Sequence, residues 1–216
     1  MSSIQQLNIL SISAAITLLI SLIMVIVALV VPQWAVISEG LGVNFTKTTI
    51  GLFQSCVTFR GISECQSYRT LDCTFELTPA SRQVCNERQA NIALLSLAIA
   101  FLTIALAAIS YFIATAKRNR PVLITSVILA SLTAIFNIAS IAVMADAVSV
   151  IQRNIPRALT NVVRASIGAS FYVIIIGFIL AFAAVGLLGY ILYSSNRNED
   201  DDESKHSAQM STPMKS

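Results

Sequence analysis

Four cysteines are the residues of this chain best suited to covalent cross-linking or metal binding. They lie in one polar segment between the first two long apolar runs, at Cys56, Cys65, Cys73 and Cys85. Paired thiols belong in an oxidising compartment, so this grouping predicts disulfide bonds on the outer side of a membrane. A zinc site is disfavoured, because no two cysteines have the short spacing of a zinc knuckle and no histidine is near.

The segment between Cys56 and Cys65 contains Gly61 and has the length of two short antiparallel strands and a turn. Facing positions on such strands have the Cα separation that a disulfide requires. Cys73 and Cys85 could then close a second loop. Four cysteines nevertheless allow three connectivities, and their spacing alone does not choose among them.

An enzyme is disfavoured by what accompanies the cysteines. The single histidine, His206, lies in the C-terminal tail, and no paired carboxylates, glycine-rich phosphate loop or metal-ligand cluster is found along the sequence. We therefore expect no catalytic site, no metal and no cofactor. A net charge of +3, scattered along the chain, also argues against nucleic-acid binding.

Four apolar runs must position these residues, and each exceeds the about 20 residues that a helix needs to cross a bilayer. Charged residues make up 12% of the chain, against about 25% in soluble domains. A cleaved signal peptide is a poorer interpretation of the first run, since residues 2–8 carry no Lys or Arg. We predict a four-helix membrane domain over residues 1–193 and a disordered tail over 194–216. The predicted helices cover residues 9–31, 92–116, 122–145 and 167–193, with loops at 32–91 and 147–166.

The orientation follows from chemistry more than from charge. The short basic hinge 117–121 favours the cytoplasm, whereas three arginines in the 147–166 loop argue the other way. The cysteines and the glycosylation sequon that begins at Asn44 place the 32–91 loop outside. Both termini are then cytoplasmic in a multi-pass plasma-membrane protein.

The first loop is rich in β-forming residues, and we predict a small antiparallel sheet with strands near 43–46, 48–53, 56–60 and 67–74. Its balanced charge suits protein contact. For the second loop we favour an amphipathic extension of the third helix over a binding face for acidic partners. Asp146 should lie in water at the end of that helix or pair with an arginine of this loop.

Three small residues of the fourth helix, Gly177, Ala181 and Gly189, fall on a four-residue grid. This spacing lets helix backbones approach closely. Packing within the bundle is the favoured interpretation, and a seam between copies is the alternative.

The chain resembles a superfamily that comprises the claudins, the peripheral myelin and epithelial membrane proteins, and the calcium-channel γ subunits. Their signature is a tryptophan beyond the first helix, followed by Gly-Leu-Trp and two spaced cysteines. This sequence has Trp34, then Gly51-Leu52-Phe53, then Cys56 and Cys65, with Phe53 in place of the second tryptophan. The segment Gly168-Ala169-Ser170-Phe171-Tyr172 is similar to the start of the family's fourth helix. Outside these motifs the sequence diverges from the vertebrate members, and it most resembles an invertebrate claudin-like (Clc-like) branch.

The resemblance implies a left-handed four-helix bundle that carries a five-stranded extracellular sheet. In this fold Cys56 and Cys65 tie neighbouring strands together. Structural roles at the foot of the sheet are implied for Trp34, Gly51, Leu52 and Phe53. Helix-packing roles are expected for Gly168, Ser170, Tyr172, Gly177, Ala181 and Gly189.

The resemblance also implies three functions. The first is assembly of cell–cell junctions and a paracellular barrier, with the chain itself or related tetraspan proteins as partners in cis and in trans. The alternatives are an auxiliary subunit of an ion channel or receptor, and a myelin-like membrane organiser. Direct PDZ binding is disfavoured, because the C-terminal Pro-Met-Lys-Ser lacks an apolar last residue.

Overall fold

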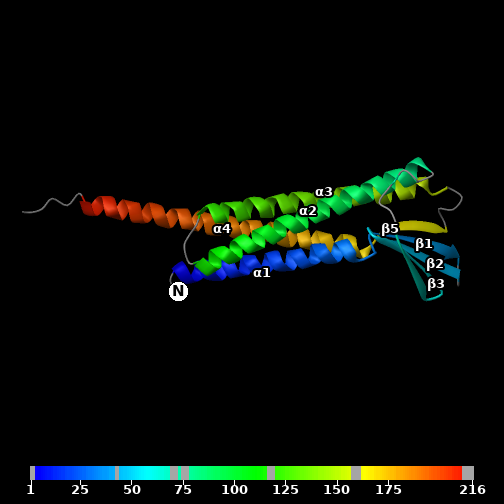
Figure 1. Ribbon diagram of the computed structural model, residues 1–216, viewed down its shortest axis with the longest axis horizontal. Coiled ribbons are helices and arrows are strands. Elements are labelled where there is room, and N and C mark those ends of the chain that lie inside the picture. The colour runs from blue at the N-terminus through cyan, green and yellow to red at the C-terminus, as the bar shows by residue number, and fades with distance from the viewer. Residues whose placement is uncertain are drawn as a thin grey trace, which may run out of the picture.

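The computed structural model describes residues 3–41, 44–68, 73, 78–115, 120–156 and 162–210. Four helices run side by side, and each packs against two neighbours: α1 and α3 both contact α2 and α4 (Figure 1). All four are long and apolar enough to cross a membrane. The chain is therefore a multi-span membrane protein, as predicted. The helices are α1 (Ser3–Val30), α2 (Pro79–Thr115), α3 (Arg120–Asn154) and α4 (Ala169–Met210).

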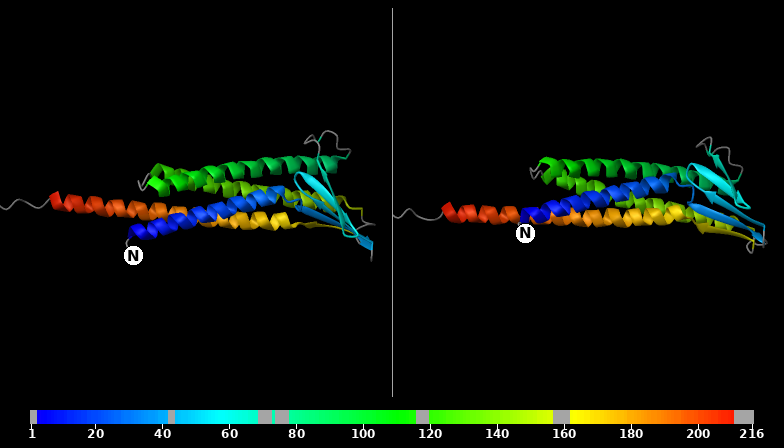
Figure 2. Two further views of the ribbon diagram at one scale, coloured as in Figure 1. Left: turned by 60° about the horizontal axis from the view of Figure 1, so that its bottom comes forward. Right: turned by 90° about the horizontal axis from the view of Figure 1, so that it is seen from below.

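A five-stranded antiparallel sheet lies at one end of the bundle, and the N-terminus and the last turns of α4 lie at the other end (Figures 1 and 2). The strand order is β4-β3-β2-β1-β5. Four strands come from the segment between α1 and α2, and the fifth comes from the α3–α4 connection. The strands are β1 (Ala35–Leu41), β2 (Asn44–Ile50), β3 (Gln54–Phe59), β4 (Ile62–Ser67) and β5 (Val163–Ile167).

The predicted sheet is confirmed, but its strands differ from the predicted ones. Strand β2 takes in most of the two strands expected at 43–46 and 48–53, but residues 51–53 are not in a strand. Strand β4 ends at Ser67, where a further strand was expected to begin, and most of that expected segment, 67–74, lies outside the described residues. Two strands, β1 and β5, are absent from the sequence prediction. They pair with each other in the register Ala35↔Ile167, so each depends on a partner far away in the sequence.

Helix α2 begins at Pro79, well before the expected residue 92, because an N-cap starts it there. The Thr78 hydroxyl oxygen accepts a hydrogen bond from the Ser81 N–H (3.1 Å), and proline is favoured at the first helical position. Cys85 therefore lies in a helix and not in a loop.

Helix α3 extends beyond residue 145 to Asn154, which confirms the expected helical extension into the second loop. Residues 163–167 of the same loop instead form strand β5. Helix α4 also extends past the expected end at 193, to Met210, through the first part of the tail predicted to be disordered. Neither glycine nor proline occurs between Gly189 and Pro213, so no helix-breaking residue stops it earlier. Residues 211–216 lie outside the described part of the chain.

The bundle buries a stripe of apolar residues from each helix and exposes large aliphatic side chains on its outer surface. An outer surface this apolar fits lipid and not water. Buried polar groups join the helices: Ser21 Oγ of α1 donates to the Gly177 carbonyl of α4 (2.9 Å), and Ser140 of α3 bonds to Asn91 of α2. Such bonds between spans are worth about 0.6 kcal/mol each.

Candidate functional site

Trp34 lies where α1 passes into the sheet, and it is fully buried. Its indole Nε1–H donates to the Ala28 carbonyl of α1 (2.6 Å), so the ring closes the end of that helix. Its backbone N–H donates to the Ile50 carbonyl (2.9 Å), and its own carbonyl accepts from the Gly168 N–H (2.9 Å). One residue thus joins the first helix, strand β2 and the start of α4.

Two glycines let three connections meet around Trp34. A Cβ on Gly51 would lie 2.5 Å from the Cα of Pro32, and one on Gly168 would overlap the Gln33 carbonyl. Neither position has room for any other residue. Leu52 beside Gly51 is also buried. The glycines are therefore needed for close approach of backbones, which no pattern of hydrophobicity reports.

Ser170 completes this junction from α4. Its hydroxyl donates to the Val31 carbonyl at the end of α1 (3.1 Å), and its backbone N–H donates to the Gln33 carbonyl (3.1 Å). Both bonds satisfy groups at helix ends that would otherwise lack partners. We call Gln33, Trp34, Gly51, Leu52, Gly168 and Ser170 the sheet anchor.

Two disulfides brace the sheet. Cys56 of β3 is bonded to Cys65, the residue directly opposite on β4, and the pairing expected from the hairpin is confirmed. The second disulfide joins Cys73 to Cys85. It ties the chain beyond β4 to the first part of α2, so both cross-links lie at the same end of the bundle.

The two faces of the sheet differ in chemistry. Side chains alternate along each strand, so residues that share a face follow from the register. We call the face that carries Ala35, Ile37 and Ile50 the cavity-side face, because these residues line a cavity against α2 and α3. The same face continues across β3 and β4 with Val57, Phe59 and Ile62. Among the residues whose side chains the structure describes, the opposite face is polar apart from the Cys56–Cys65 disulfide and Val36, and carries Ser38, Lys47, Thr58, Ser63, Arg164 and Ser166.

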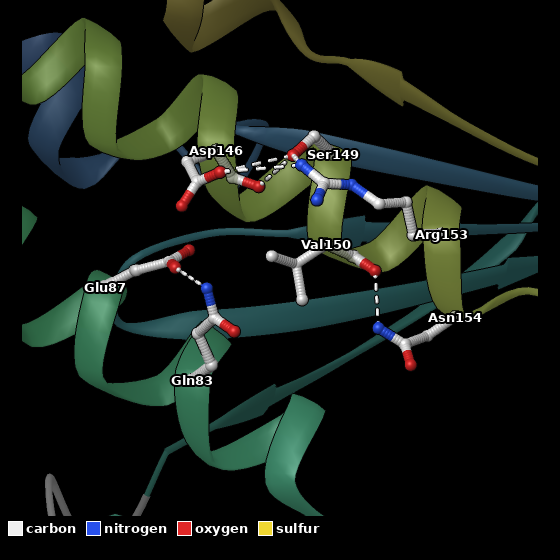
Figure 3. Close-up of polar contacts among 7 residues, drawn as sticks. All are labelled: Gln83, Glu87, Asp146, Ser149, Val150, Arg153 and Asn154. Atoms are coloured by element: carbon white, nitrogen blue, oxygen red, sulfur yellow. Dashed lines mark hydrogen bonds and ion pairs between the residues drawn. The ribbon is translucent and has the colours of Figure 1, made fainter.

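Carboxylates of α2 and α3 face each other beneath the sheet (Figure 3). Asp146 lies 3.9 Å from Arg153 Nη2, which confirms that it pairs with an arginine of the predicted second loop. That arginine also donates to Ser149 Oγ (2.8 Å). Glu87 accepts a hydrogen bond from Gln83 Nε2 (2.8 Å) and interacts with Asp146, a group of like charge.

Other predicted site residues lie away from these contacts. Phe53 is 43% exposed and Tyr172 is 59% exposed, so neither side chain is buried in the junction or the bundle. A Cβ on Gly189 would meet nothing within 4 Å, whereas one on Gly177 would lie 3.4 Å from the Met24 side chain. Packing between helices is thus seen at Gly177, and at the buried Ala181, but not at Gly189. The backbone of Asn44 starts β2, and its side chain lies outside the described part of the structure.

Sequence reasoning missed the part played by Gln33 and by the strands β1 and β5. A weak signal was present for β5, since apolar residues alternate over 163–167, directly beside a membrane span. The segment 35–41 shows no such alternation, because Ala35, Val36 and Ile37 are consecutive apolar residues. Within the described ranges, no three or more His, Cys, Asp or Glu side chains gather in a group that could hold a metal ion.

A four-helix membrane bundle that carries a disulfide-linked antiparallel sheet on a tryptophan–glycine junction defines a class of tetraspan membrane proteins. The family model described as PMP-22/EMP/MP20/Claudin tight junction matches residues 19–189. The chain belongs to this family, and the predicted superfamily is confirmed. No curated protein sequence matches the chain.

Proposed function

We propose that this chain is a non-enzymatic protein of cell–cell contacts, which assembles with copies of itself or related tetraspan proteins into a paracellular barrier. The observation that carries this proposal is the exposed apolar end of the cavity-side face. Val57, Phe59 and Ile62 are 44%, 46% and 77% exposed on a sheet that stands outside the bundle. Contiguous apolar side chains on a surface outside the membrane favour a protein contact.

The proposal requires that the sheet lie outside the cell and both termini inside. Two disulfides in the sheet region support this orientation, because such bonds persist in oxidising compartments. The sequon begins at Asn44, the first residue of β2, and would be glycosylated there. A glycosidase-sensitive mobility shift that is lost in Asn44→Gln would support the orientation, and glycan attachment at an engineered site in the 117–121 hinge would contradict it.

The charge of the sheet supports a barrier over an ion path. The family resemblance implies that charged residues of the first loop set ion preference in pore-forming members. On the described strands, the cavity-side face carries only Glu39 and Glu64 as charged residues, among mainly apolar and hydroxyl side chains. Such a face offers few charges to line a conducting path.

The test is to image a tagged chain in cells without endogenous junction proteins, mixed with cells that do not express it. We expect enrichment only where two expressing cells touch. Phe59→Ser with Ile62→Ser should abolish this enrichment without loss of surface expression. The matched control is Thr58→Ser with Ser63→Thr, which keeps the hydroxyl pair on the opposite face of the same hairpin. An even surface distribution of the unaltered chain would exclude homotypic adhesion.

A second candidate, an auxiliary subunit of a channel or receptor, is favoured by one observation on α4. Added Cβ atoms at Gly186 and Gly189 would meet nothing within 4 Å, so this helix presents open backbone to the membrane. Small residues of this kind let a further membrane helix approach closely. Under this function the chain would localise with a channel whether or not a neighbouring cell expresses it, and Gly189→Ile would break that association.

A further inference from the structure

A cavity of about 510 Å³ lies between the cavity-side face of the sheet and the adjoining ends of α2 and α3. Its size falls in the range of about 300–1,000 Å³ that is typical of small-molecule sites. Its walls are mainly aliphatic. They include Ile37, Ile50, Val84, Val150, Ile151 and Val163.

Arg88 is the polar group of this cavity with unused hydrogen-bonding capacity. Its Nε is buried and has no hydrogen-bond partner in the structure. The guanidinium carbon lies 3.8 Å from the centre of the Tyr68 ring, and Nη2 makes a long contact of 3.5 Å to Cys85 Sγ. A guanidinium can donate five hydrogen bonds and binds carboxylates in pairs of them.

The other polar groups of the lining are better satisfied or lie in water. The Asn154 amide donates to the Val150 carbonyl (2.8 Å), and Ser81 bonds to Thr78. The second charged residue among the described lining residues, Glu39, is exposed. An anion beside Arg88 would therefore give this unsatisfied donor a charged acceptor, whereas an apolar ligand without an acceptor would leave the donor buried without a partner, at a cost in free energy.

The position of the cavity indicates where a ligand would come from. Met144, Ala147 and Leu52 lie in its wall, at the level where the apolar runs of the spans give way to the sheet. The cavity is thus apolar space next to the headgroups of one membrane leaflet. Water fills such aliphatic space poorly, and an acyl chain fills it well.

We propose that this cavity binds a long-chain fatty carboxylate, with its acyl chain between the sheet and the ends of α2 and α3 and its carboxylate on Arg88. The volume suits a ligand with one chain better than a two-chain phospholipid. A sterol would occupy the apolar walls, but its neutral hydroxyl is a weaker partner for the guanidinium than a carboxylate. The proposal rests on the cavity and on Arg88, and it is independent of the proposed junctional function.

The test uses the purified full-length chain in phosphatidylcholine nanodiscs and a palmitate analogue that carries a photoreactive diazirine on its chain. Mass spectrometry of the irradiated protein should place the label on β1, α2 and α3 residues of the cavity wall. Palmitate should compete with the probe. Palmitate methyl ester, cholesterol and phosphatidylserine should compete at least tenfold less well.

Two variants and a control test the residues. Arg88→Gln should weaken competition by palmitate about tenfold, because a charged hydrogen bond is lost. Arg153→Gln, which removes an exposed arginine nearby, is the matched control and should leave competition unchanged. Val84→Trp should fill the cavity and remove the label, with an intact Cys73–Cys85 disulfide as the check that it folds. Equal competition by the methyl ester, unchanged competition in Arg88→Gln, stronger competition by phosphatidylserine, or label elsewhere would each overturn the proposal.

Discussion

A Cβ atom on Gly168 would overlap the carbonyl group of Gln33, because the connection from β5 to α4 crosses directly over the connection from α1 to β1. Two hydrogen bonds hold this crossing. The Gly168 N–H donates to the Trp34 carbonyl (2.9 Å), and the Ser170 N–H donates to the Gln33 carbonyl (3.1 Å). Segments from opposite halves of the chain therefore determine together where the sheet begins and where the last helix begins.

This crossing predicts that Gly168→Ala destabilises the protein strongly. The added methyl group would meet backbone atoms, which cannot move aside as a flexible side chain can. We expect a loss of about 3 kcal/mol in the free energy of unfolding, at the upper end for overpacking. Thermal unfolding of the purified protein in detergent measures it.

The matched control is Gly186→Ala in α4, where an added Cβ meets nothing within 4 Å. Alanine has the higher helix propensity, so this change should be neutral or stabilise by up to about 1 kcal/mol. Equal stability of the two variants would show that the α1–β1 and β5–α4 connections are not held as closely as the structure has them.

The membrane spans could be predicted from the sequence because a long apolar run has few alternatives. The hairpin of β3 and β4 was also accessible, since its partners are neighbours in the chain and Cys56 and Cys65 mark facing positions. The helical start at Pro79 was missed because hydropathy reports where the lipid begins, whereas the Thr78 N-cap determines where the helix begins.

The sheet anchor was only partly accessible from the sequence. The family motif pointed to Trp34, Gly51 and Gly168, but motif spacing does not say which backbones come close together. The pairing of β1 with β5 arises only when α1 and α4 lie side by side in the bundle. Tertiary packing therefore decides the pairing of these two strands, and the β-propensity of each segment does not report it.

Removal of either disulfide should lower stability by a similar amount, but only removal of the second should weaken palmitate binding. Both close short loops, with sequence separations of 9 and 12, and loops of this size contribute about 3 kcal/mol each. Replacement of Cys56 and Cys65 together by serine should lower the unfolding temperature but leave the label-binding cavity intact, because neither residue lines it. The Cys73→Ser, Cys85→Ser pair should have a similar effect on stability and also weaken palmitate binding, since Cys85 lies in the cavity wall. Equal palmitate binding in both double variants would contradict this difference.

Close packing of α1 on α4 predicts different tolerance at two glycines. A Cβ at Gly177 would lie 3.4 Å from Met24 and 3.6 Å from Val25, so alanine fits there but a branched side chain does not. Gly177→Ile should cost about 1–3 kcal/mol by separating the helices and breaking the Ser21 hydrogen bond. Gly189→Ile, on open helix surface, is the control and should change the unfolding temperature little. If both variants unfold alike, the seam between α1 and α4 is not the close contact described.

The facing carboxylates beneath the sheet predict that Glu87→Gln stabilises the protein. Burial of the Glu87 carboxylate and, after it, the like charge of Asp146 both disfavour the charged form of Glu87, and one oxygen of Glu87 is buried without a hydrogen-bond partner. An amide in its place would remove the like charge and could donate a hydrogen bond to the Asp146 carboxylate. The expected gain is about 0.5 kcal/mol, as for other partly exposed charge pairs, and it should shrink as salt screens the repulsion. Thermal unfolding at low and high salt measures both effects.

Glu64→Gln, on the exposed strand β4, is the control and should show no gain. A loss of stability in Glu87→Gln would mean that the carboxylate has a favourable interaction that outweighs the repulsion.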